Sequence, residues 1–239
     1  MPWYAKPTGG YTHDSTEAIA NANEVRNIFT TAGFAINSIS AVAGAFQSEC
    51  DFNPWQWEGD AIQSESSINP NVGYGLPQFT PATSYIGNST AISQAGYAPN
   101  FSDSPGNATD GQAQSLFIAN YHLNADWYTM DYSRWNSVFS SLSPPVSINT
   151  AYYDISTAAD FIRGTYSGTT TPFSVQDLII AFIIKYLRPA DSSVINGFHS
   201  RYLAESNYWY NYYTGTPPTP PTPTTRRKMP LWMMLRHQI

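Results

Sequence analysis

The sequence predicts an α+β domain that is mostly α-helical, and three observations lead to this prediction. Capping signals and hydrophobic periodicity mark several separate helices along the chain. The segment 174–187 is apolar almost throughout and is expected to be the central helix of the core. Residues 51–110 are irregular and rich in Gly, Pro, Asn and Ser, which leaves room for a short hairpin near 64–80.

The first part of the chain is expected to hold a loop over 1–13 and two helices, at about 15–32 and 37–50. The first helix has a start signal in Asp14, Ser15 and Glu17 and an end signal in Gly33. The second has an apolar face formed by Ile39, Val42, Ala43 and Phe46. We expect Asn53-Pro54 to end it, because the residue before a proline is pushed out of the α region.

The later helices are expected at about 111–128, 155–164, 174–187 and 196–213, and 129–153 is expected to be loop-rich. Ser174 with Asp177 resembles a capping box at the start of the apolar helix. Arg188-Pro189 is expected to stop that helix.

The composition changes sharply after residue 215. Residues 216–225 contain only Pro and Thr, which favours an extended, semi-rigid linker. Residues 226–239 are rich in Met, Trp and Leu and are too short to form a core, so we expect a peptide that docks on a partner protein. A disordered tail and a contact with a membrane surface are the alternatives. This gives an N-terminal extension (1–14), a catalytic domain (15–215), a linker (216–225) and a docking peptide (226–239).

Charge and cysteine content exclude several classes of protein. The net charge is −6, yet four of the eleven Lys and Arg residues lie in 216–239, which has no acidic residue. The other seven, with seventeen Asp and Glu, give residues 1–215 a net charge of −10, which disfavours nucleic-acid binding. The single cysteine, Cys50, cannot form an intrachain disulfide and lies in no Cys/His motif typical of a nucleophile.

No metal or cofactor is expected. The sequence has no His-Glu-x-x-His, Cys-x-x-Cys or P-loop motif. The longest apolar run, 178–187, is too short to span a bilayer and contains Lys185. The N-terminus has no apolar core of a signal peptide, so we expect no export by that route.

Glu49 is the candidate general acid. Glycoside hydrolysis needs a carboxylic acid that stays protonated near neutral pH. Burial of the preceding apolar helix and the negative end of its dipole would both raise the pKa of a glutamate at this position. The alternative is a solvated glutamate at a helix end. The glycine-framed segment that follows, Gly73-Tyr-Gly-Leu-Pro-Gln78-Phe-Thr80-Pro, favours the interpretation of Glu49 as a catalytic residue.

Together, Gln47-Ser-Glu49, Asn53-Pro54 and the segment from Gly73 to Pro81 resemble the phage tail lysozyme family over about 15–213. The resemblance implies a lysozyme-like domain in the virion tail that cleaves peptidoglycan at the host cell wall during DNA entry. It implies Glu49 as the acid and Gln78 and Thr80 at the cleft. Tyr74, Trp57 and Tyr85 are further substrate-binding candidates. Other tail proteins are the expected partners of the docking peptide.

Four alternatives remain open at this stage. Gln63-Ser-Glu65 with Asn69-Pro70 repeats the pattern of Gln47 to Pro54, but Glu65 lacks a preceding apolar helix and hence a rigid mount. The second carboxylate is assigned to Asp60, with Glu58 as the alternative. A lytic transglycosylase would need Glu49 but no second carboxylate. A virion protein without catalytic activity would need neither Glu49 nor a second carboxylate.

Overall fold

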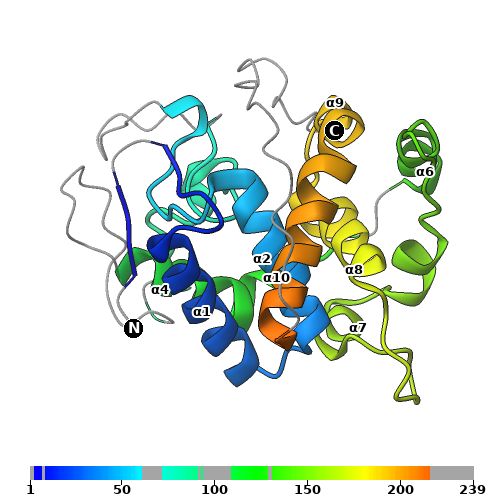
Figure 1. Cartoon of the computed structure of the whole chain (residues 1–239), viewed down its shortest axis with the longest axis horizontal. Helices are drawn as coiled ribbons and strands as arrows, with labels where there is room; N and C mark the ends of the chain where they lie inside the picture. Colours follow the sequence, from blue (N-terminus) through cyan, green and yellow to red (C-terminus); the bar gives the residue numbers. More distant parts are fainter. Residues whose placement is uncertain are drawn as a thin grey trace. The chain divides into compact units, whose positions relative to one another are not determined.

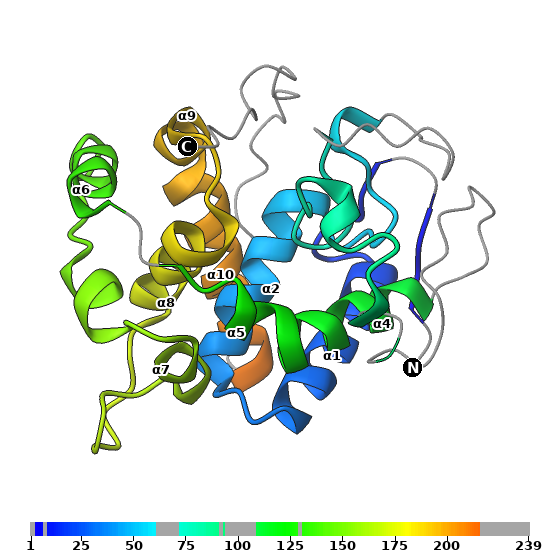
Figure 2. The same ribbon diagram turned by 180° about the vertical axis from the view of Figure 1, so that it is seen from behind.

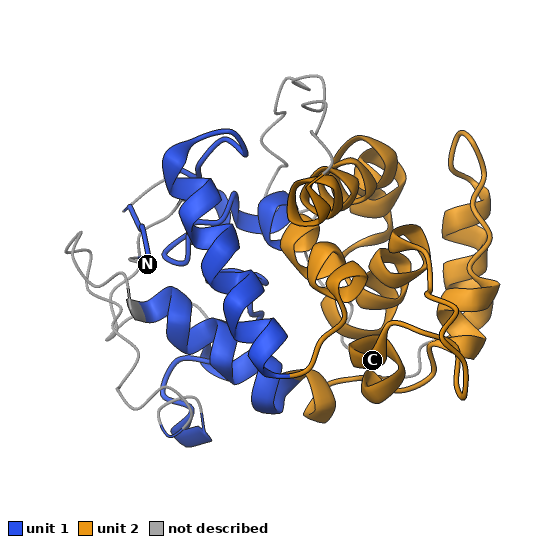
Figure 3. Cartoon of the chain, turned by 60° about the horizontal axis from the view of Figure 1, so that its bottom comes forward, with its two compact units in different colours: residues 1–32, 46–122 blue, residues 33–45, 123–239 orange. Residues whose placement is uncertain are grey.

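The computed structural model describes residues 3–6, 9–60, 72–90, 93, 109–128 and 131–215, without the side chains of Asp60 and Thr109. The chain divides into two compact units (Figure 3): residues 1–32 with 46–122, called unit 1, and residues 33–45 with 123–239, called unit 2. The predicted linker 216–225 and docking peptide 226–239 lie outside the described residues, and both stay predictions.

Unit 1 is built on helix α1 (Thr16–Thr31), which lies beside α4 (Thr109–Phe117) in Figures 1 and 2. The α1 helix begins at Ser15, whose hydroxyl oxygen accepts a hydrogen bond from the backbone N–H of Ala18 at 3.1 Å. Soon after its end comes Gly33, which has a φ of 87° that an L-residue rarely adopts. The predicted helix at 15–32 is therefore confirmed. The helical path of α4 continues through the π-helical turn η4 (Ile118–His122).

Unit 2 is built around helix α8 (Val175–Phe182), which continues as the π-helical segment η6 (Ile183–Leu187). Every residue from 178 to 187 is buried, so the predicted central helix is confirmed. Ser174 caps its start, because its hydroxyl oxygen accepts the N–H of Asp177 at 3.0 Å. The helix ends at Leu187, where Arg188 takes a left-handed conformation with a φ of 50°.

The other elements of unit 2 surround or flank this helix: α5 (Leu123–Ala125), α7 (Ala158–Arg163), α9 (Asp191–Gly197), η7 (Phe198–Leu203) and α10 (Ala204–Thr214). The last three correspond to the helix predicted at 196–213, which in fact begins at Asp191. The chain enters a helix there directly after the Arg188 turn, and the periodicity of 191–197 is weak.

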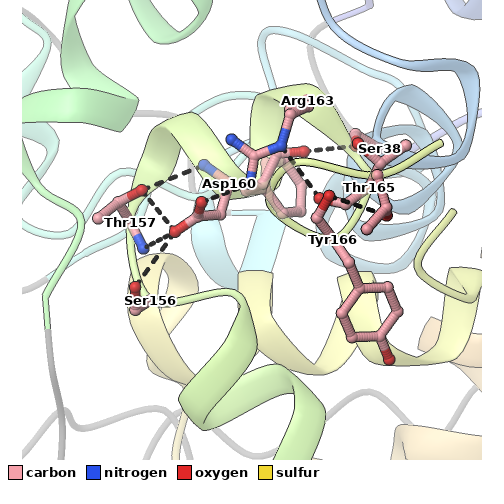
Figure 4. A network of polar contacts seen from close by, with 9 residues as sticks. Ser38, Ser156, Thr157, Asp160, Arg163, Thr165 and Tyr166 are labelled. Atoms are coloured by element: carbon pink, nitrogen blue, oxygen red, sulfur yellow. Dashed lines mark hydrogen bonds and ion pairs between the residues drawn. The ribbon is translucent and has the colours of Figure 1, made fainter. Parts of the chain in front are cut away.

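The short helix α7 is fixed by a polar network (Figure 4). Thr157 and Asp160 cap each other's backbone, and the Asp160 carboxylate accepts an ion-paired hydrogen bond from Arg163 at 2.6 Å. The Ser38 hydroxyl donates to the Phe161 carbonyl at 2.6 Å. Ser38 lies in the first turn of helix α2 (Ile36–Cys50), so this bond attaches the start of α2 to α7 within unit 2.

The prediction of a loop-rich region over 129–153 was wrong. It contains helix α6 (Tyr132–Ser140) and the π-helical turn η5 (Thr150–Asp154). Asp131 caps α6 by accepting the Ser133 N–H at 2.8 Å, and Trp135, Val138 and Phe139 are buried on one face. Their spacing is helical, but the serines and prolines around them obscure it.

The described part of the chain has isolated β-bridges in place of extended strands: Trp57 with Tyr74, Tyr74 with Phe79, and Thr165 with Pro172, all antiparallel. The fold is therefore mostly α-helical, as expected, with a small antiparallel turn at 73–79. The first part of the hairpin expected near 64–80 lies outside the described residues. Among the described helices, none combines the length and apolar character needed to cross a membrane.

Candidate active site

Glu49 lies in the last turn of α2 and its side chain is half-buried. One turn earlier on the same helix, Phe46 packs edge-on against Phe29 and Phe52, with ring centroids 6.4 Å apart in both pairs. All three rings are fully buried. The end of the helix that carries Glu49 is thus held by a close-packed aromatic cluster within unit 1, as a rigidly mounted catalytic group requires.

Helix α2 ends at Cys50, earlier than the proline signal alone would place it. Asp51 and Phe52 have φ values of 52° and 56°, in the left-handed region. Two consecutive left-handed residues reverse the chain before Asn53 is reached. The helix stops because of this turn, and Pro54 lies beyond it.

The polar residues that precede and follow Glu49 in the sequence motif form hydrogen bonds to the N-terminal segment. The Asn53 amide donates to the carbonyls of Lys6 and Gly9, at 2.8 and 2.6 Å, and its oxygen accepts the Lys6 N–H at 3.2 Å. The Gln47 amide donates to the Tyr11 carbonyl at 3.0 Å. These residues therefore shape the backbone on both sides of Glu49.

Asn21 of helix α1 has a similar structural role. Its side-chain amide donates to the carbonyls of Tyr4 and Phe52, both at 2.8 Å, and accepts the Tyr4 N–H at 2.7 Å. Asn21 is fully buried. The left-handed turn after Glu49 is thereby fastened to α1 through the Phe52 carbonyl.

The glycine-framed segment forms a tight turn, called turn 73–80. Tyr74 and Phe79 exchange both backbone hydrogen bonds, at 3.1 and 2.8 Å, and the Gln78 N–H donates to the Gly75 carbonyl at 3.0 Å. Gly75 has a φ of 79°, and a Cβ added there would lie 2.3 Å from Oε1 of Gln114. Only glycine fits this position, since it needs both the left-handed conformation and the missing side chain.

Gln78 itself has a left-handed backbone, with a φ of 51°, and is 9% exposed. Its amide donates to the carbonyls of Gln56 and Gly75, both at 3.0 Å. The hydroxyl of half-exposed Thr80 donates to the Gln78 carbonyl at 3.0 Å. A non-glycine residue held at positive φ costs about 1–3 kcal/mol and is found preferentially at functional sites.

The aromatic residues expected to bind substrate are core residues of unit 1. Trp57, Tyr74 and Tyr85 are 5%, 1% and 0% exposed. The Trp57 and Tyr74 rings lie 4.5 Å apart, and Tyr85 stacks on Phe79 at 5.1 Å. Because so little of each ring is exposed, these side chains stabilise turn 73–80 by packing in the core of unit 1.

The candidates for the second carboxylate differ in their surroundings. Glu58 is 7% exposed, and its Oε2 accepts the N–H of Gly73 at 2.8 Å. The backbone N–H of Glu58 donates to the Gly73 carbonyl at 2.9 Å. Asp60 ends the short helix η1 (Glu58–Asp60), but its side chain is outside the described atoms. Glu65 also lies outside the described residues.

Two buried residues of α4 belong to this region and were not predicted. Gln114 accepts the Leu76 N–H and donates to the Pro54 carbonyl, both at 2.7 Å. Asp110 accepts the hydroxyl of Tyr74 at 2.6 Å. Their spacing of four residues, at the start of the helix predicted at about 111–128, is the only signal that the sequence offers. An aspartate at a helix start is ordinarily explained by the helix dipole, so the signal is weak.

The described residues contain no group of three or more His, Cys, Asp or Glu side chains placed to hold a metal ion. The polar groups around Glu49 and turn 73–80 are amides, hydroxyls and carboxylates.

Comparison with known proteins identifies the family of the chain. The family model of phage tail lysozymes matches residues 20–213, which include Glu49, turn 73–80 and the Asp110–Gln114 pair. A relative is morphogenesis protein 1 of Bacillus phage B103, which is 34% identical over 70 residues, or 29% of this chain. The match spans 18% of that relative's length. Since the family model covers most of the chain, the protein belongs to the phage tail lysozyme family.

Proposed function

We propose that this chain is a virion-associated muramidase. It hydrolyses the bond between N-acetylmuramic acid and N-acetylglucosamine in the host wall during DNA entry, with Glu49 as the general acid. Membership of the phage tail lysozyme family supports a cell-wall hydrolase carried by the particle. The observation that carries the assignment of Glu49 is its position: a half-buried carboxyl on the last turn of a well-packed helix, in the same compact unit as turn 73–80.

The backbone that carries Glu49 is rigidly packed, which suits an acid that must donate its proton to one glycosidic oxygen. General acid catalysis depends on geometry, because the proton is transferred only within hydrogen-bond reach. The buried rings of Phe29, Phe46 and Phe52 leave the end of α2 little freedom to move. The left-handed turn at 51–52 then directs the chain away from Glu49, which leaves part of its side chain exposed.

Turn 73–80 is proposed as the wall of the substrate site. Thr80 is the better candidate for direct contact, because it is half-exposed whereas Gln78 is nearly buried. Gln78 would act by keeping the turn closed through its bonds to Gln56 and Gly75. Trp57, Tyr74 and Tyr85 would contribute rigidity and not ring stacking on sugars.

The hydrogen bond from Gly73 to Glu58 bears on the second carboxylate. A buried carboxylate already engaged by a backbone N–H is poorly available to a water molecule or a sugar carbon. This favours Asp60 over Glu58 as base or nucleophile. It also supports the second candidate function, a lytic transglycosylase, which needs no second carboxylate.

A place in the particle is part of the proposal. The relative in phage B103 is named a morphogenesis protein, which refers to assembly of that phage. For this chain we propose that residues 226–239 dock on a neighbouring tail protein while the catalytic units stay free. The Pro/Thr linker of ten residues would reach roughly 30 Å at about 3.1 Å per residue in polyproline form.

The decisive experiment digests purified peptidoglycan and weighs the products. A muramidase leaves reducing sugar ends, and a transglycosylase leaves anhydro ends that are lighter by one water. Glu49→Gln should fold normally and lose activity by roughly 10²–10⁴-fold, the usual contribution of acid–base catalysis. Glu65→Gln is the matched control from the repeated motif and should remain active.

Asp60→Asn and Glu58→Gln separate the remaining mechanisms. We expect strong impairment for Asp60→Asn and mild impairment for Glu58→Gln. Full activity in both would leave the transglycosylase. A wild-type chain that releases no product would leave a wall-binding or structural protein, and full activity of Glu49→Gln would remove Glu49 from the mechanism.

A further inference from the structure

Asp110 is a fully buried carboxylate with no place in the proposed chemistry. It lies in the first turn of α4, and three side chains of unit 1 donate hydrogen bonds to it: the Tyr74 hydroxyl at 2.6 Å, the Tyr85 hydroxyl at 2.7 Å and the Gln114 amide at 2.8 Å. An ionised carboxylate only accepts hydrogen bonds, so it suits three donors. Burying such a group is unfavourable unless it is hydrogen-bonded. Its presence calls for a specific explanation.

The partners of Asp110 converge on turn 73–80. Tyr74 belongs to the turn itself. Gln114, one helical turn after Asp110, accepts the N–H of Leu76 and donates to the carbonyl of Pro54, which follows the end of α2. Tyr85 follows the turn and stacks on Phe79. One carboxylate therefore lies at the centre of contacts to both segments that carry the proposed site.

Close packing makes these contacts specific. The missing side chain of Gly75 leaves the space that the Gln114 amide occupies, since an added Cβ would come within 2.3 Å of its oxygen. The amide therefore reaches the Leu76 N–H in the middle of the turn. A shift of Gln114 would break a backbone contact of the turn and a contact of the Pro54 loop together.

We propose that Asp110, acting through Tyr74, Tyr85 and Gln114, is a positioning residue that holds turn 73–80 in the conformation that presents Thr80 to the glycan strand. This proposal rests on the proposed function for its substrate, but the holding of the turn can be measured without turnover. Asp110 touches no reacting atom in this account. Its effect would reach the substrate only through the turn.

The ionisation of Asp110 gives the proposal a distinctive signature. Burial raises the pKa of its carboxyl to about 6, and the three hydrogen bonds limit the rise. Among the residues that the structure describes, the titratable groups hydrogen-bonded to it are the Tyr74 and Tyr85 hydroxyls. The charged residues of α1, the helix beside α4, are Glu17, Glu24 and Arg26, and none contributes to this pKa.

The direction of the pH effect follows from the linkage between proton binding by Asp110 and opening of the turn. A local opening of the turn that admits water to Asp110 would return its pKa toward the ordinary 3.8. Since the closed state binds the proton more tightly, opening should become easier as pH rises from about 4 to about 6 and then level off. A pKa difference of about two units corresponds to a roughly 100-fold change in the opening equilibrium.

The experiment is amide hydrogen exchange of the full chain, corrected for the intrinsic pH dependence of exchange. It compares a peptide covering 72–80 with peptides from α1 and α8. In the wild type, exchange of the 72–80 peptide should rise between about pH 4 and about pH 6 and then level off. In Asp110→Asn, which keeps the shape without the charge, the transition should be absent. Tyr74→Phe should loosen the turn by roughly tenfold, the usual effect of losing a hydrogen bond to a charged group. Tyr85→Phe should loosen it less, because only Tyr74 is part of the turn.

Turnover supplies an independent measurement. Asp110→Ala should raise KM for solubilised peptidoglycan strands more than it lowers kcat, and Asp110→Asn should restore most of the affinity. If Asp110→Ala does not fold, the Tyr74→Phe and Asp110→Asn measurements decide. A 72–80 peptide that exchanges alike in wild type, Asp110→Asn and Tyr74→Phe overturns the proposal, and so does equal loosening of α1 and α8. If exchange behaves as expected but the wild type cleaves no peptidoglycan, the proposed function fails while the holding of the turn stands.

Discussion

Gly44 provides a sharp test of how helix α2 is mounted. It lies in the middle of α2, where replacing glycine by alanine normally stabilises a helix by about 1 kcal/mol. Here the sign should reverse. A Cβ at this position would lie 2.2 Å from the Ser206 hydroxyl oxygen and 2.4 and 2.5 Å from the Ser206 backbone nitrogen and Cα. Gly44 and Ser206 both belong to unit 2, so the contact joins α2 to α10 within one unit.

The size of the effect follows from these distances. Ordinary contacts of a Cβ lie at 3.4–4 Å, so α10 must move by about 1 Å because backbone atoms cannot rotate away. The Ser206 hydroxyl cannot simply turn, since it donates to the Tyr202 carbonyl at 2.7 Å in a fully buried site. Overpacking of this kind costs about 1–3 kcal/mol, or more where backbone must shift. After the gain in helix propensity, we expect a net loss of about 2 kcal/mol, or a fall in Tm of about 4–8 °C.

The assay is thermal unfolding of Gly44→Ala beside the wild type, followed by circular dichroism. Gly197→Ala is the matched control in the same unit, because a Cβ there meets nothing closer than the Arg201 Cδ at 3.7 Å. The control should be neutral or slightly stabilising. If Gly44→Ala were as stable as the wild type, the close approach of α2 to α10 could not be as described.

Two further predictions concern Glu205 and the C-terminal segment. Burial raises the pKa of Glu205 on α10 to about 7, against the opposing effect of Arg201. The folded state therefore binds the proton more tightly than the unfolded chain, and this group's contribution to stability falls as pH rises from about 4.5 to 7. Glu205→Gln should thus raise Tm at pH 8 and leave it nearly unchanged at pH 4, and an equal shift at both would contradict this assignment. Deleting 216–239 should leave purified enzyme able to cleave peptidoglycan but absent from assembled particles, whereas particles with normal amounts of the truncated protein would refute the docking role.

Helices with local signals were predictable from the sequence. The α1 helix has a Ser15 cap and α8 a Ser174 cap, and both caps form hydrogen bonds to the expected N–H groups. The α6 helix was missed although Asp131 caps it, because serine and proline dominate its neighbourhood. The helical periodicity of this segment depends on only three buried residues, Trp135, Val138 and Phe139, whereas its local composition favours a loop.

The candidate site was predictable only where it depends on local sequence. The position of Glu49 at the end of an apolar helix follows from the spacing of its neighbours. The burial of Tyr74 does not, because an aromatic residue in a glycine-rich segment can either stack on a sugar or fill the core. The hydrogen bond that keeps Tyr74 in the core is made to Asp110, which lies 36 residues further along the chain. No local pattern encodes such a pairing.

The two parts of the proposed site are held by different kinds of interaction. Helix α2 belongs partly to unit 2 and partly to unit 1, and apolar or close packing fixes it in each: at Gly44 in the former, at Phe46 in the latter. The atoms in these two contacts belong to no titratable group. Turn 73–80 is instead held by a buried polar network centred on a carboxylate. Substrate binding should therefore carry a pH dependence between about pH 4 and pH 6 that Asp110→Asn removes.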